Sequence, residues 1–226
     1  IGAEALLRWN RDNPNKLTPG DFIPIIESTE LIHAIGSWVV DVACSACSQW
    51  HKEGYEISVA VNVSAMQLAR VGFYETVATS LQQSGLPPHF LEIELTEHLL
   101  IQENPTIQSQ LSDLKKLRVK IAIDDFGTGY SNMGYLTRIE VDTLKLDRSF
   151  ISEIENSPDS LAIVTAINQM ARVLGMNIVA EGVERESERQ VLESIDCQMG
   201  QGFLWSKALP TNLLMDYLQT KQPAFS

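Results

Sequence analysis

The stretch of sequence that decides the fold is Ile121-Ala122-Ile123-Asp124-Asp125-Phe126-Gly127-Thr128-Gly129-Tyr130-Ser131. Its apolar, partly β-branched beginning predicts a strand, which ends at two adjacent aspartates and continues into a glycine-rich loop. Two interpretations of the aspartates are open. Aspartate and glycine are frequent turn residues, so the pair could cap a turn. Because neighbouring carboxylates are costly to bury without cations, the same strand end also suits one or two hard metal ions.

Polar residues recur at the ends of other predicted strands. The predicted strands at 58–63, 91–95, 141–146 and 177–180 carry or precede the following polar residues: Asn62, Glu94, Glu97, Lys145, Asp147, Glu181 and Glu184. At the start of the chain, an apolar strand predicted over Ile1–Arg8 contains Glu4 and Arg8. In a barrel, the carboxyl ends of the parallel strands meet at one face. This pattern is therefore typical of a barrel whose active site lies on that face.

Helical stretches separate the predicted strands, for example at 31–53, 73–84 and 159–174. Strands that alternate with helices of this length predict parallel βαβ units in an α/β fold. A doubly wound open sheet is the competing architecture. The spread of polar strand ends along the whole chain favours a barrel. About seven strands are predicted, one fewer than in a full barrel, so we expect a single, N-terminally truncated domain over residues 1–226 that lacks the strand before Ile1.

Composition excludes several classes of protein. A chain of 226 residues with 44% hydrophobic residues suits one domain with a large core. Its net charge of −12 argues against a nucleic-acid-binding surface. No apolar run reaches about 18 residues, the length needed for a membrane-spanning helix. Three cysteines suit a reducing compartment. Cys44 and Cys47 form a Cys-x-x-Cys pair in a predicted helix, and without further ligands we expect packing instead of a zinc or redox site.

Seven short motifs occur along the chain in this order: Glu4-Ala5-Leu6-Leu7-Arg8, Asn62-Val63-Ser64, Glu94-Leu95-Thr96-Glu97, Asp124-Asp125-Phe126-Gly127, Lys145-Leu146-Asp147, Glu181-Gly182-Val183-Glu184 and Gln201-Gly202-Phe203. Each is weak alone, but in this order they resemble the EAL-domain family of cyclic di-GMP phosphodiesterases over nearly the whole chain. The resemblance implies a modified, TIM-like (β/α)8 barrel in which one strand is antiparallel. It also implies hydrolysis of one phosphodiester bond of cyclic di-GMP, which gives linear pGpG.

The resemblance implies a site for two metal ions. Four residues match the ligands of the first ion: Glu4, Asn62, Glu94 and Asp124. Asp124 would bridge to a second ion that is also held by Asp125 and Glu181. Because all these ligand atoms are oxygens, the site should select Mg²⁺ or Mn²⁺ over zinc. Ca²⁺ should bind but inhibit, since its longer bonds and looser geometry would disturb the alignment of the reacting groups.

The resemblance also assigns residues to the substrate and the attacking water. Lys145 matches a lysine that contacts the water, and Glu97 matches a glutamate that anchors the loop Phe126–Leu136. Arg8 matches a phosphate-binding arginine, while Gln201 and Asp147 are expected near the metals and the substrate. Glu181 has two possible roles, general base and ligand of the second ion. We favour the ligand role, because water activated by two metal ions needs little help from a base.

The resemblance further implies a homodimer contact near the Phe126–Leu136 loop. It also implies sensory or diguanylate cyclase domains in the parent protein and a cytoplasmic location, although the parent protein can itself be tethered to a membrane. The competing function is a non-catalytic receptor for cyclic di-GMP. Such receptors usually lose one or more metal ligands, whereas this sequence keeps them all.

Overall fold

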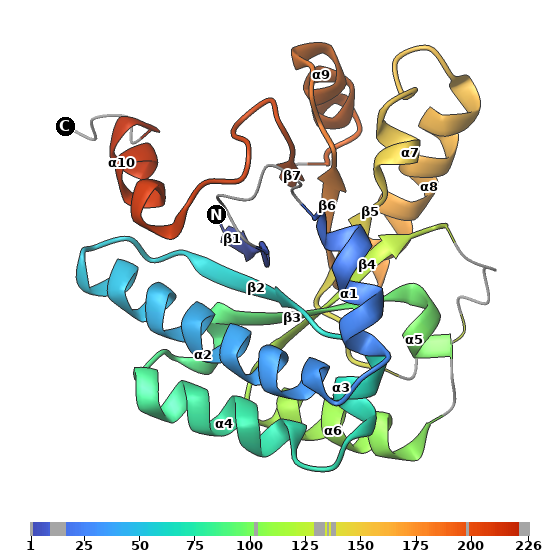
Figure 1. The fold of residues 1–226 in the computed structure, drawn as a ribbon. Coiled ribbons are helices and arrows are strands. Elements are labelled where there is room, and N and C mark those ends of the chain that lie inside the picture. Colours follow the sequence, from blue (N-terminus) through green and yellow to red (C-terminus); the bar gives the residue numbers. More distant parts are fainter. Residues whose placement is uncertain are drawn as a thin grey trace.

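The computed structural model describes residues 2–9, 17–101, 104–128, 134, 136, 139–197 and 199–221. Seven strands form one sheet: β1 (Gly2–Ala5), β2 (Ser58–Asn62), β3 (Leu91–Thr96), β4 (Lys120–Phe126), β5 (Thr143–Leu146), β6 (Asn177–Glu181) and β7 (Met199–Gln201). They pair in sequence order, and every pair is parallel (Figure 1). A doubly wound sheet reverses its strand order at a switch point. The strictly sequential order is that of a barrel, so the predicted α/β barrel class is confirmed.

The sheet curls into a half-barrel. Its outermost strands approach each other at the carboxyl end, where the Gln201 side chain in β7 donates a hydrogen bond to the Glu4 carboxylate in β1 at 2.6 Å. Those two strands are the ends of the hydrogen-bonded order. The antiparallel strand that the resemblance implied is not among the seven described strands.

Most element boundaries lie within two residues of their prediction. The helix at Phe73–Ser84 was predicted to the residue, and the strand predicted over 141–146 begins two residues later, at Thr143, and ends at Leu146 as predicted. The strand predicted over Ile1–Arg8 is too long, because β1 ends at Ala5, where its pairing with β2 also ends.

Helices line the outer face of the sheet, for example below β2 and β3 in the view of Figure 1. The long ones are α2 (Leu31–Lys52), α4 (Phe73–Ser84), α6 (Pro105–Lys116), α8 (Pro158–Val173), α9 (Glu186–Ser194) and α10 (Thr211–Lys221). Shorter pieces are α1 (Pro19–Glu27), α3 (Ala65–Ala69), the 3-10 turn η1 (Pro88–Phe90), α5 (Glu97–Ile101) and α7 (Arg148–Ile151). Their starts are locally encoded: the Asn104 and Ser157 side chains accept N–H bonds from the first turns of α6 and α8.

Among the described helices, α2 alone is long and apolar enough to cross a membrane by length and composition. Packing accounts for much of that apolar character, since α2 contacts β2 and α4 and buries Val40, Cys44 and Cys47 in the core. Both cysteines are free thiols, and burial raises their pKa values to about 12 and about 11. The Cys47 thiol donates to the carbonyl of Ile57. These contacts agree with the predicted packing role.

Candidate active site

Lys145 lies at the centre of the predicted site, in β5, with 3% of its side chain exposed. Its Nζ atom is 2.9 Å from Glu94 Oε1, 3.0 Å from Asp124 Oδ1 and 2.9 Å from Glu181 Oε1. A fourth carboxylate, that of Glu4, lies 3.7 Å away. Four carboxylates therefore surround a single buried ammonium group, which cannot neutralise them.

Six strands supply this cluster by the same rule. Side chains alternate between the two faces of a strand, so one residue near each carboxyl end points to the inside of the curled sheet. In order from β1 to β6, these residues are Glu4, Asn62, Glu94, Asp124, Lys145 and Glu181. Because the strands are parallel, their carboxyl ends all lie at the same end of the sheet.

A β-bulge lets both aspartates of β4 reach the site. The register with β5 pairs Ile123 with Leu144 and then Phe126 with Leu146, so Asp124 and Asp125 together face Lys145. Asp125 has a φ of 53°, in the left-handed region that non-glycine residues rarely adopt. Adjacent residues of a regular strand would point to opposite faces. Here, oxygens of Asp124, Asp125 and Glu181 lie within 4.8 Å of one another, a spacing that could hold a metal ion.

Two amide side chains bind the carboxylate of Glu4, the residue that β1 contributes to the site. Asn62 Nδ2 and Gln201 Nε2 each donate a hydrogen bond of 2.6 Å to Glu4, one to each carboxylate oxygen. Each amide keeps an oxygen that can accept a hydrogen bond or bind a cation. The structure thus joins Asn62, a member of the cluster, and Gln201, which lies beside it, to the same carboxylate.

Glu97 lies behind the bulge, with 4% of its surface exposed. Its Oε2 atom accepts the backbone N–H of Gly127 at 3.0 Å. Gly127 has a φ of 95°, and a β-carbon there would lie 2.7 Å from the Phe150 ring, so only glycine fits without rearrangement. Glu97 thereby holds the backbone two residues beyond Asp125. Most of the loop that follows, including 129–133, lies outside the described residues.

Arg8 and Asp147 are not in the carboxylate cluster. The Arg8 guanidinium is exposed and donates to the carbonyl of its neighbour Leu7. Asp147 caps α7 by accepting the N–H of Ser149 at 3.0 Å. Sequence patterns did not single out Arg148, which pairs with Glu184 at 2.9 Å. The available signal was its place directly after the Lys145-Leu146-Asp147 motif.

The electrostatics show an excess of negative charge. Burial raises the pKa of Glu94 to about 8 and that of Glu181 to about 7, against the opposing pull of Lys145. Burial and the nearby Asp124 carboxylate also raise the pKa of Asp125. Burial lowers the pKa of Lys145, but the carboxylates, Glu94 foremost, outweigh it and hold that pKa above its ordinary value. Without added cations, protons must therefore compensate part of the cluster.

The donor set fits divalent cations. The Oε2 atom of Glu94 is buried and has no hydrogen-bond partner among the described residues, and an orphaned buried carboxylate oxygen is costly unless a cation meets it. The cluster offers oxygen atoms and no thiolate or imidazole, which favours Mg²⁺ or Mn²⁺. The residues present therefore suit such ions.

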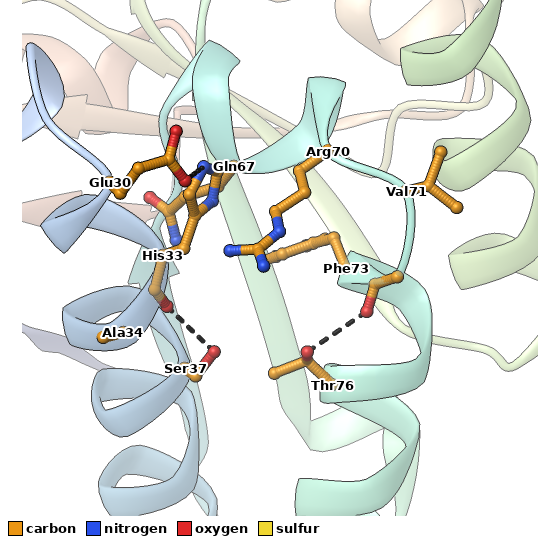
Figure 2. Close-up of a pocket in the computed structure, with 10 residues that line it drawn as sticks. Glu30, His33, Ala34, Ser37, Gln67, Arg70, Val71, Phe73 and Thr76 are labelled. Atoms are coloured by element: carbon orange, nitrogen blue, oxygen red, sulfur yellow. Dashed lines mark hydrogen bonds and ion pairs between the residues drawn. The ribbon is translucent and has the colours of Figure 1, made fainter.

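A pocket of about 550 Å³ lies elsewhere, between α2, α3 and α4. It is lined by Glu30, His33, Ser37, Arg70 and Thr76, among others (Figure 2). None of the cluster residues lines it, and two of the hydroxyls are engaged with the backbone of their own helices, Ser37 with His33 and Thr76 with Gly72. This pocket is therefore separate from the carboxylate site.

Comparison with known proteins shows the family of this chain. The family model described as the EAL domain matches residues 1–208. The chain belongs to the EAL-domain family. A curated relative, the bifunctional diguanylate cyclase/cyclic di-GMP phosphodiesterase MucR of Pseudomonas aeruginosa, is 41% identical over 216 residues, which are 95% of this chain and 32% of that protein. The cyclic di-GMP phosphodiesterase NbdA of the same organism is 39% identical, over 96% of this chain and 28% of its own length.

Solved EAL domains share the fold closely. The MucR phosphodiesterase in complex with c-di-GMP aligns with a TM-score of 0.89 at 41% identity, covering 95% of this chain and 87% of that one. The EAL domain of Mycobacterium smegmatis DcpA aligns with a TM-score of 0.79 at 38% identity, covering 85% and 87%. This EAL domain spans about a third or less of the length of MucR and NbdA.

Proposed function

We propose that this EAL domain is a metal-dependent phosphodiesterase that hydrolyses cyclic di-GMP to linear pGpG. One observation carries the proposal: four carboxylates from separate strands surround Lys145, within 3.7 Å of its ammonium group, at the carboxyl end of the sheet. Its relatives MucR and NbdA are named as cyclic di-GMP phosphodiesterases, and the MucR domain was solved with c-di-GMP.

Two cations, Mg²⁺ or Mn²⁺, would be held by this chain. The first would take Glu4, Asn62, Glu94 and Asp124 as ligands, and the second would take Asp124, Asp125 and Glu181. Bound ions of this kind lower the pKa of water and neutralise charge that develops on a phosphoryl group. Because the pKa values of Glu94 and Glu181 are raised, binding of these ions at neutral pH would displace protons from the two carboxyl groups.

Lys145 positions the attacking water and adds positive charge beside the phosphate. Its Nζ atom has three donor N–H groups in the middle of the cluster, and the neighbouring carboxylates keep it protonated. Glu181 would act mainly as a metal ligand, because its carboxylate lies within the group formed with Asp124 and Asp125. Glu97 keeps the bulge and the following loop in place through Gly127. Arg8 would bind a phosphate oxygen once the substrate arrives, with Gln201 and Asp147 close to the substrate.

We also propose the wider setting of the domain. Dimerisation would occur through the Phe126–Leu136 loop region. Because this loop directly follows Asp124 and Asp125 in the chain, dimerisation would be coupled to catalysis. In the cytoplasm, the domain would act beside sensory or diguanylate cyclase domains. The name of the relative MucR includes a diguanylate cyclase activity.

The decisive test incubates the purified chain with cyclic di-GMP and separates the products by chromatography. We expect linear pGpG with Mg²⁺ or Mn²⁺, no product with chelator, and inhibition when Ca²⁺ is added. The alternative function, a receptor, predicts tight binding of cyclic di-GMP and no product under any of these conditions. That result, obtained with a folded sample, would exclude the phosphodiesterase proposal.

A further inference from the structure

A buried carboxylate outside the cluster accepts hydrogen bonds from the segment that follows Glu181. Glu188, the third residue of α9, is 3% exposed. Its Oε2 atom accepts the backbone N–H groups of Glu184 at 2.8 Å and Arg185 at 2.9 Å. Its Oε1 atom accepts Nε and Nη2 of the Arg185 side chain at 3.0 and 2.7 Å. One carboxylate thus binds two loop amides and a guanidinium group at once.

These bonds extend beyond the needs of the helix. α9 begins at Glu186, and Arg185 is the residue immediately before it. The hydrogen bond that the Arg185 N–H donates to the Glu188 carboxylate is usual at a helix start, where it belongs to the capping box. The bond to the Glu184 N–H lies one residue further back, in the loop itself. Glu188 therefore fixes the backbone between the end of β6 and the helix.

Arg185 extends this restraint to the neighbouring strand connection. Its Nη2 atom also lies 3.0 Å from the carbonyl oxygen of Ser152 and 2.8 Å from Glu155 Oε2. Both residues belong to the turn after α7, the short helix that starts three residues after Lys145. The Arg185–Glu188 pair thus connects the segments that follow β5 and β6, the strands that carry Lys145 and Glu181.

The other side of the loop is equally restrained. Val183 donates its N–H to the Gln201 carbonyl and accepts the N–H of Leu204, each at 3.0 Å. Gly202 packs so closely that a β-carbon there would lie 2.1 Å from the Val183 oxygen. The loop between Glu181 and α9 is held at Val183 by the β7 segment and at Glu184 and Arg185 by Glu188.

We propose that Glu188 is a positioning residue of the active site, which holds residues 182–185 so that Glu181 stays against Lys145 and Asp124. The role rests on the proposed phosphodiesterase function and explains why a carboxylate is buried away from the cluster. Displacing a catalytic group by about 1 Å can cost about 100-fold in rate. A loosened loop should therefore reduce turnover and metal binding more than substrate binding.

The test compares Glu188→Ala and Glu188→Gln with Glu193→Ala. Glu193 lies on the same helix, but its carboxylate pairs with Arg189 on the exposed surface, so it is the matched control. We expect Glu188→Ala to lower kcat about 10-fold or more, to raise the Mn²⁺ concentration that gives half-maximal activity, and to leave KM for cyclic di-GMP within about twofold. Glu188→Gln keeps an oxygen for the two amides and should recover most of kcat. Glu193→Ala should match the wild type.

A second readout does not depend on activity. In metal-free protein, amide hydrogen exchange over residues 181–185 should speed up in Glu188→Ala and stay unchanged in Glu193→Ala. Should Glu188→Ala not fold, Arg185→Gln removes the connection to Ser152 and Glu155 and should give the same faster exchange and lower kcat. Wild-type kcat, metal dependence and exchange in the folded variant, with only a lower melting temperature, would show that Glu188 is merely a helix cap.

Failure of the two proposals can be told apart. If the wild type hydrolyses no cyclic di-GMP while Mn²⁺ affinity and amide exchange still respond to Glu188→Ala, the phosphodiesterase function is wrong and the positioning role stands. If the wild type is active and both measurements are unaffected by the substitution, the positioning role is wrong.

Discussion

Gln201 in β7 and Glu4 in β1 are joined by a hydrogen bond of 2.6 Å, although 197 positions separate them in the chain. Their strands are the two ends of the sheet order. At this point, side chains and not strand pairing bring the first and last strands together. Because Asn62 bonds the other oxygen of Glu4, the carboxylate is oriented from both sides.

Replacing Gln201 by alanine should release Glu4 from that orientation. We expect kcat/KM to fall about 10-fold, which corresponds to about 1.4 kcal/mol of transition-state stabilisation, with a change of at most about 1 kcal/mol in the free energy of unfolding. Steady-state kinetics measure the change in kcat/KM, and thermal unfolding measures the change in stability. Gln108→Ala, an exposed glutamine on α6, is the control. Equal losses of activity in both variants would argue against a specific role for Gln201.

Lys145→Ala removes the ammonium group that lies among the four carboxylates of the cluster. Breaking a buried ion pair typically costs about 3–5 kcal/mol, so the metal-free variant should unfold at a lower temperature than the wild type. Added Mn²⁺ should recover part of that loss, because it supplies the missing positive charge. Activity should fall about 100-fold or more, since the attacking water loses its positioning group. A variant that keeps wild-type turnover would rule out this role for Lys145.

Stability of the metal-free domain should decrease as the pH rises. Glu94 and Glu181 have pKa values of about 8 and about 7, above those of unfolded glutamate. The folded state therefore binds more protons than the unfolded state between about pH 4.5 and pH 8, and folding stability falls across that window. Thermal unfolding at several pH values should show that the melting temperature drops by several degrees across this window, since about 1 kcal/mol of unfolding free energy corresponds to about 2–4 °C in a domain of this size. Saturating Mn²⁺ should flatten the dependence.

Glu97→Ala should weaken metal binding and activity together while the domain stays folded. The substitution leaves the Gly127 N–H without its acceptor and loosens the backbone beyond Asp125. Glu97→Gln keeps an oxygen that can accept this bond and should retain much of the activity. Mn²⁺ titrations alongside circular dichroism provide the measurement. An alanine variant with unchanged Mn²⁺ affinity would show that the loop base does not depend on this bond.

Glu181→Gln should abolish most turnover and leave much of the affinity for cyclic di-GMP. The amide keeps an oxygen, but it loses the charge that lies near Asp124 and Asp125. The loss should appear in kcat and in the metal dependence, with a smaller change in the Kd measured by calorimetry. An active Glu181→Gln enzyme with normal metal dependence would contradict the assigned role.

Local features of this protein follow from the sequence alone. Strand and helix positions, such as Thr143–Leu146 and Phe73–Ser84, are encoded in apolar periodicity and in glycine stops, which act over a few residues. The same patterns identified which acids and amides end strands. They overextended the first strand to Arg8, because the periodicity of one strand does not show where its partner stops pairing.

Only the tertiary structure decided how these residues meet. The bulge that turns Asp124 and Asp125 toward Lys145 arises from a register between two strands, and the bond from Gln201 to Glu4 arises from the curl of the whole sheet. The contacts of Glu188 and Arg185 likewise depend on how α9 packs beside the turn after α7. Register, curl and helix docking come from contacts between residues that are far apart in the chain. Local sequence patterns specify which groups are available, and long-range packing sets the distances at which they act.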